Sequence, residues 1–187
     1  MIPNLLTLSR IFSIPFIVGC FYMEGFYAHL AAAVLFMFAC LTDFFDGYFA
    51  RQWKQGSAFG RFMDPVADKL LISTILLMLS GFGIISGVHL IAAAIILARE
   101  IIVSGLREYL SSAQQVAIPV TRYAKWKTAT QMISVCCLLC SALFPNGVSL
   151  KGFGLSILWL ASAMTILTGA KYLKFGIVRI SDIPERP

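Results

Sequence analysis

The chain has 187 residues, of which 59% are hydrophobic and only 13% are charged. An ordinary soluble domain has about 25% charged residues, so this composition excludes a soluble globular domain and a disordered chain. Because a membrane-spanning helix uses about 20 apolar residues, six spans would use roughly 120 positions and leave only short connectors. We therefore expect one polytopic, all-α membrane domain over residues 1–187.

Six apolar runs along the chain predict six transmembrane helices. Turn-forming residues at 24–25, 81–83 and 145–147 separate consecutive runs. The five cysteines lie inside the runs with no His or Asp at zinc-ligand spacing beside them, so we expect small apolar side chains rather than disulfides. The helices are expected at 5–23, 29–52, 61–81, 84–110, 119–143 and 153–175.

The basic residues lie mainly on one side of the predicted bundle. Six spans place both termini on the same side, and most Lys and Arg residues lie in or near the connectors around 53 and 113 and after 175, whereas the other side has Lys151 alone. Because cytoplasmic loops carry the excess of Lys and Arg, we expect both termini in the cytoplasm and a multi-pass location in the cell (inner) membrane. This orientation accounts for the net charge of +6, and no nucleic-acid partner is expected.

Four aspartates lie inside the second and third predicted spans. Asp43 and Asp46 are three residues apart, and Asp64 and Asp68 are four apart, so each pair shares one helix face. The connector is short, so the two helices should run antiparallel and bring all four carboxylates to the cytoplasmic boundary. A charge within a membrane helix costs at least about 2.5–3.5 kcal/mol, so the carboxylates must face one another, water or a cation. Oxygen ligands of this kind suit Mg²⁺ or Mn²⁺, and a pair of such ions serves displacement at phosphorus.

Two other interpretations of the aspartates stay open. A divalent-cation transporter also places acids in a membrane, but it has no use for Arg51 or Gly60. A noncatalytic scaffold would use the acids as polar contacts between helices, for which ordinary salt bridges would suffice.

Small and basic residues extend the aspartates into a longer pattern. Gly47, Ala50 and Gly60 leave room for a flat group beside the predicted metal site, and Arg51 adds a fixed positive charge. Residues 43–68 read D-x-x-D-G-x-x-A-R-x8-G-x-x-x-D-x-x-x-D, which resembles the signature of the CDP-alcohol phosphatidyltransferase family at every fixed position. Further segments resemble the bacterial branch of the family that makes phosphatidylglycerophosphate: 3–10, 64–69, 98–100, 106–108 and 125–128, followed by Gln131.

The resemblance implies a metal-dependent transfer of a phosphatidyl group from CDP-diacylglycerol, a membrane lipid, to sn-glycerol 3-phosphate, with release of CMP. It implies that Asp68, besides binding metal, is the base for the attacking hydroxyl, and that the enzyme is a homodimer. Two ions, Mg²⁺ or Mn²⁺, are implied at Asp43, Asp46, Asp64 and Asp68. The CDP group is implied to contact Asn4, Thr7, Asp46, Gly47, Ala50, Arg51 and Gly60.

A second charged cluster is expected to bind the acceptor. Cations close together suit a phosphate monoester, whereas inositol, serine or phosphatidylglycerol would need a different lining. A sibling enzyme for another acceptor, such as a cardiolipin, phosphatidylserine or phosphatidylinositol phosphate synthase, is the nearest alternative function. The cations could instead anchor the helices or pair with Glu100 and Glu108. The expected phosphate-binding residues are Arg99, Arg107, Lys125 and Lys127.

Two histidines and three basic residues are not expected to carry chemistry. His29 and His89 lie toward the face opposite the acids and are interpreted as interfacial residues. Arg122, Lys171 and Lys174 are interpreted as ordinary anchors at the cytoplasmic boundary.

Overall fold

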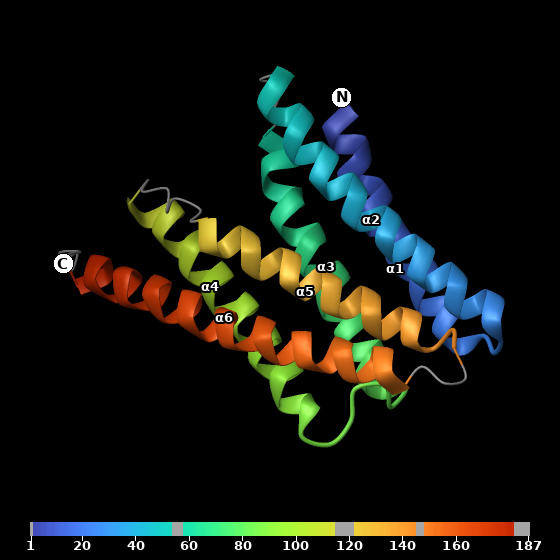
Figure 1. Cartoon of the computed structure of the whole chain (residues 1–187). Helices are drawn as coiled ribbons and strands as arrows, with labels where there is room; N and C mark the ends of the chain where they lie inside the picture. The colour runs from blue at the N-terminus through green and yellow to red at the C-terminus, as the bar shows by residue number, and fades with distance from the viewer. Residues whose placement is uncertain (1, 54–57, 115–121, 145–147, 182–187) are drawn as a thin grey trace.

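The computed structural model describes residues 2–53, 58–114, 122–144 and 148–181. Over these residues the chain is all-α, which confirms the expected fold class. Figure 1 shows the helices in chain order. They are α1 (Ile2–Tyr22), α2 (Phe26–Trp53), α3 (Ala58–Gly81), α4 (His89–Gln114), α5 (Arg122–Ser141) and α6 (Val148–Ser181).

Two of the connections between helices contain glycines in left-handed conformations. Gly25 has a φ of 109° between α1 and α2, and Gly83 and Gly87 have φ values of 73° and 59° between α3 and α4. Glycine adopts such angles without steric cost. Because two of these turns lie within residues 83–87, α4 begins at His89, and the expected start at residue 84 was wrong.

Two helical stretches among the described residues are long and apolar enough to cross a membrane: His89–Leu110 in α4 and Ser149–Ile177 in α6. Thr7–Tyr22 and Phe26–Thr42 are shorter apolar stretches. Much of the outer surface is covered by large apolar side chains of the kind that a soluble protein would bury. Examples more than half exposed are Phe12, Phe16, Leu41, Ile101 and Leu167.

One apolar core draws buried side chains from all six helices. Helices α5 and α6 pack closely, because a Cβ added to Gly154 would lie 3.0 Å from Leu138 Cγ. At the same crossing Ser134 Oγ donates a hydrogen bond of 2.8 Å to the Gly154 carbonyl. Small residues and hydroxyl bonds of this kind hold membrane helices together, since lipid provides no hydrophobic drive for their association. In the described residues none of the five cysteines is part of a disulfide.

The helix ends separate into two groups in Figure 1. The start of α1, the end of α2 and the start of α3 lie at the top, whereas the end of α4, the start of α5 and the end of α6 lie at the left. The predicted metal-binding segment therefore belongs to the first three helices, and the predicted acceptor cluster belongs to the last three.

Candidate functional site

Helix α1 contacts the aspartate-bearing start of α3 through two polar side chains. Thr7 Oγ1 donates a hydrogen bond to Asp64 Oδ1, and Arg10 Nη1 forms a salt bridge with Asp68 Oδ1. Thr7 and Arg10 are three residues apart on α1, and their partners are four apart on α3, so one face of each helix supplies both contacts. The structure thus brings together the two predicted carboxylates of α3 on a single side.

Arg10 is the residue of this site that sequence reasoning missed. Its side chain is 1% exposed, whereas that of Asp68 is 38% exposed. A guanidinium buried in a membrane helix needs an acidic partner, because an unpaired charge there is strongly unfavourable. The signal was present, since Arg10 is an isolated base in an apolar run, but its partner lies 58 positions away.

The second site lies where α4, α5 and α6 meet. Glu100 Oε1 accepts from Arg99 Nη1 at 3.1 Å and from Lys127 Nζ. Arg99 Nη2 also donates to Thr168 Oγ1 at 3.2 Å, and its guanidinium lies 5.7 Å from the centre of the Tyr172 ring. Two of the expected acceptor residues therefore converge on one carboxylate. The contact agrees with the alternative that these cations pair with Glu100. It also brings Arg99 and Lys127 together at one place.

Gly169 on α6 makes room for the Arg99 side chain. A Cβ added at this glycine would lie 2.9 Å from Arg99 Cγ, closer than two carbon atoms approach without a shift. The close approach of α6 places Thr168 against the guanidinium. Sequence reasoning did not single out Gly169, because a lone glycine in an apolar helix has no distinctive spacing.

Comparisons with known proteins show the family of the chain. The CDP-alcohol phosphatidyltransferase family model matches residues 1–167. The chain belongs to that family. A relative from Rickettsia bellii is 43% identical over 173 residues, covering 92% of this chain and 93% of its own. Relatives from Pectobacterium atrosepticum, 39% identical with 92% of each chain covered, and Cereibacter sphaeroides, 32% identical with 97% of each covered, carry the same name. That name is CDP-diacylglycerol–glycerol-3-phosphate 3-phosphatidyltransferase.

Part of the CDP-alcohol phosphatidyltransferase signature lies where the structure describes backbone but no side chains. Asp43 and Asp46 belong to α2. The side chains of several other predicted residues also lie outside the described part: Asn4, Gly47, Ala50, Arg51, Gly60 and Lys125. Among the side chains that are described, no three from His, Cys, Asp or Glu group closely enough to hold a metal ion. The roles predicted for Asp43, Asp46 and the residues just listed remain predictions.

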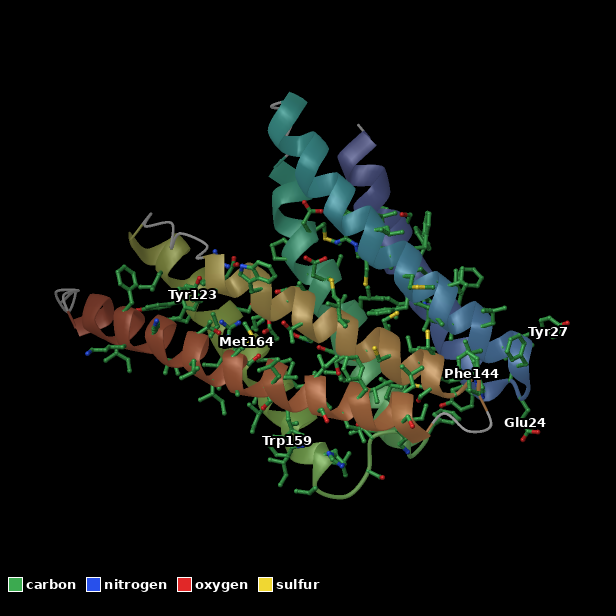
Figure 2. All side chains as sticks on the ribbon, viewed as in Figure 1. Glu24, Tyr27, Tyr123, Phe144, Trp159 and Met164 are labelled. Atoms are coloured by element: carbon green, nitrogen blue, oxygen red, sulfur yellow. The ribbon has the colours of Figure 1, made fainter. Side chains whose placement is uncertain are left out.

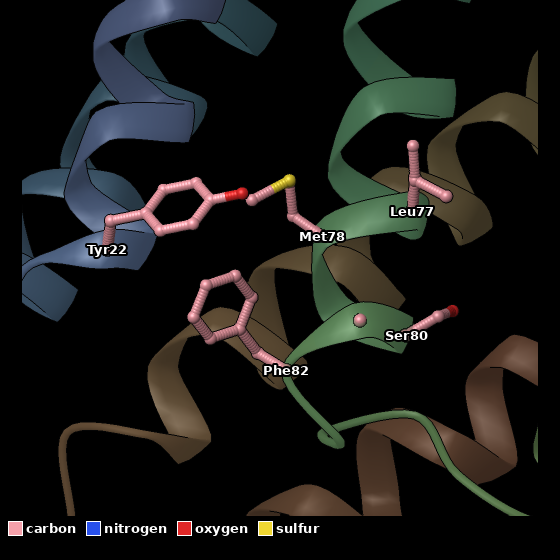
Figure 3. Close-up of a pocket in the computed structure, with 6 residues that line it drawn as sticks. Tyr22, Leu77, Met78, Ser80 and Phe82 are labelled. Carbon is pink, nitrogen blue, oxygen red and sulfur yellow. The ribbon is translucent and has the colours of Figure 1, made fainter.

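The far end of the molecule holds features unrelated to the signature. A cavity of about 660 Å³ lies at the end of α3 and is lined by Tyr22, Leu77, Met78, Ser80, Gly81 and Phe82. Figure 3 shows Tyr22 of α1 facing Met78 of α3 there. Since Asp64 and Asp68 lie near the opposite end of α3, this cavity is not the predicted site. His89, at the start of α4, accepts a hydrogen bond of 3.1 Å from Trp159 on α6. Figure 2 labels Trp159.

Proposed function

We propose that the chain transfers the phosphatidyl group of CDP-diacylglycerol to sn-glycerol 3-phosphate and releases CMP. The observation that carries this proposal is the 39–43% identity to relatives of that name over 92% of the chain. The described geometry supports it. Carboxylates for metal binding lie on α3, and cations for a phosphate group lie between α4 and α5.

The carboxylates of α2 and α3 fit the divalent metal ions that members of this family use. Oxygen donors alone suit Mg²⁺ or Mn²⁺. The residues that would hold two such ions are Asp43, Asp46, Asp64 and Asp68. When bound, the ions would offset the negative charge of the diphosphate and of the departing CMP.

In the transfer, the phosphorus that carries the diacylglycerol exchanges its bond to CMP for a bond to the acceptor. The acceptor hydroxyl attacks the phosphorus that carries the diacylglycerol, and the bond from that phosphorus to the CMP oxygen breaks. Asp68 takes the proton of the attacking hydroxyl as general base. Its salt bridge to the buried Arg10 fixes the carboxylate in position, and such positioning contributes to the rate as proton transfer does.

The acceptor's phosphate binds in the basic cluster of Arg99, Arg107, Lys125 and Lys127. Arg99 and Lys127 already meet at Glu100, with side chains that are 13% and 4% exposed. Cations shielded from water bind a phosphate more strongly than exposed ones, because the effective dielectric is lower. Glu100 keeps the two side chains together before the acceptor arrives.

The membrane arrangement completes the proposal. All six helices span the bilayer, both termini face the cytoplasm, and two copies form a homodimer. The basic ends of the helices support the orientation through the excess of Lys and Arg on one side. CDP-diacylglycerol reaches the site from the inner leaflet.

Release of CMP from CDP-diacylglycerol by the purified protein tests the function. With Mg²⁺ or Mn²⁺ present, glycerol 3-phosphate is expected to be the best acceptor among glycerol 3-phosphate, phosphatidylglycerol, serine and inositol phosphate. The variant Asp68→Asn should lower kcat by about 10²–10⁴-fold, the usual contribution of a general base. A different preferred acceptor would indicate a sibling enzyme. Divalent-cation flux into vesicles without CMP release would indicate a transporter.

A further inference from the structure

Lys69 connects the two polar sites. It follows Asp68 directly on α3, and its Nζ donates a hydrogen bond to Ser104 Oγ on α4. Ser104 lies four residues after Glu100 and three before Arg107, so all three share one face of α4. Lys69 therefore extends from the helix of the proposed base to the polar face of the proposed acceptor site.

Lys69 and Lys127 approach the same face of α4 from different helices. Lys127 contacts Glu100 directly, and Glu100 also acts electrostatically on the Lys69 ammonium. Arg99 and Lys127 thus contact Glu100, and Lys69 reaches the same face of α4 one turn away, at Ser104.

The charges of this cluster leave an excess that a phosphate would neutralise. Among the described side chains, Lys69, Arg99, Arg107 and Lys127 against Glu100 and Glu108 leave a formal charge of +2. Asp68 also acts on Lys69, but its Oδ1 is bound to the buried Arg10. An excess of buried positive charge is unfavourable in a membrane protein unless an anion compensates it. A phosphate monoester carries a charge close to −2 at neutral pH, whereas a phosphodiester carries only −1.

We propose that Lys69 is a further ligand of the acceptor's phosphate and selects a phosphate monoester. This inference rests on the proposed function and adds a residue to its site. The hydrogen-bond partner of Lys69 is a neutral hydroxyl, so the ammonium exchanges Ser104 for the phosphate without breaking an ion pair. Because Lys69 adjoins Asp68, it holds the short three-carbon acceptor with its hydroxyl near the base.

The test compares Lys69→Met with a matched control. Lys69→Met removes the charge and keeps the side-chain length, and it should raise the KM for glycerol 3-phosphate by about tenfold or more, as expected for a charge-assisted hydrogen bond. The KM for CDP-diacylglycerol should not change. Lys69→Arg should recover part of the loss. Lys171→Met is the control, because Lys171 is exposed and its Nζ lies 5.3 Å from the centre of the Tyr123 ring, which Figure 2 labels. It should leave both KM values unchanged.

Ser104→Ala separates phosphate binding from a structural link between α3 and α4. It removes the hydroxyl and keeps the charge, so the KM for glycerol 3-phosphate should stay within about twofold. Titration calorimetry of glycerol 3-phosphate with the detergent-purified variants gives the same comparison without turnover. The proposal is overturned if Lys69→Met leaves that KM unchanged, raises both KM values equally, or behaves as Ser104→Ala does. Failure of the proposed function is distinct, because the unaltered protein would then release no CMP with glycerol 3-phosphate.

Discussion

The first three helices and the last three differ in the sign of their charged sites. A base lies beside acidic residues in the first group, and an acid lies beside basic residues in the second. In the first group, Asp68 of α3 is paired with the buried base Arg10, which is 1% exposed. In the second group, Arg99 and Lys127 are accompanied by one acid, Glu100, which is 17% exposed. Each group thus contains a central residue of the opposite sign to its reactive residues.

This difference shows how a membrane protein keeps charged groups ready for a charged substrate. Within a low-dielectric environment, like charges repel strongly unless a counter-charge lies among them. Arg10 and Glu100 provide those counter-charges from the chain itself. The two central residues should therefore affect stability in the absence of substrate, and Lys69 should affect affinity for the acceptor.

The largest effect on stability is expected from removing the partner of Arg10, which is the more buried of the two central residues. Asp68→Asn removes the carboxylate that binds Arg10 and leaves the guanidinium buried, so the free energy of unfolding should fall by up to about 3–5 kcal/mol. Thermal unfolding of the detergent-purified protein measures the loss. The double variant Arg10→Met with Asp68→Asn removes both charges and should recover most of the lost stability, although it stays inactive. A double variant no more stable than Asp68→Asn would show that the salt bridge is not what stabilises α1 on α3.

A smaller effect is expected at the central acid. Glu100→Gln keeps the shape of the side chain and removes the charge, so Arg99 and Lys127 should repel each other and lower the unfolding free energy by about 1–3 kcal/mol. Saturating glycerol 3-phosphate should restore more stability to this variant than to the unaltered protein, because its phosphate replaces the missing carboxylate. Thermal unfolding with and without the acceptor makes this comparison. Equal stabilisation of both proteins would separate Glu100 from the acceptor site.

The sequence predicted the number and class of the helices better than their ends. Apolar runs mark the part of a helix that suits lipid. The helix can continue into polar sequence, because its backbone hydrogen bonds form there as well. For this reason α6 extends over Val148–Ser181, beyond the predicted 153–175. The start of α4 was misplaced for a different reason, because the conformations of Gly83 and Gly87 cannot be read from hydropathy.

The candidate site was predictable where the residues are rare and regularly spaced. Asp64 and Asp68 stood out because acids inside spans are unusual, and the structure places both against α1. Thr7 was assigned to the CDP group through the resemblance, and its contact with Asp64 places it at the edge of the predicted metal site. Arg10 and Lys69 were missed because each acts through a partner on another helix, and such pairing leaves no local pattern.

The smallest effect is expected from a single methyl group behind the acceptor cluster. Gly169→Ala places a Cβ 2.9 Å from Arg99 Cγ, so the guanidinium must shift away from Thr168. The KM for glycerol 3-phosphate should rise a few-fold, while the KM for CDP-diacylglycerol should stay constant, because Asp64 and Asp68 are untouched. Gly152→Ala is the matched control on the same helix, since a Cβ there meets no atom within 4 Å. It should be neutral or slightly stabilising, as alanine favours helix over glycine by about 1 kcal/mol. If Gly169→Ala raised both KM values together, the two halves of the site would be mechanically coupled rather than separate.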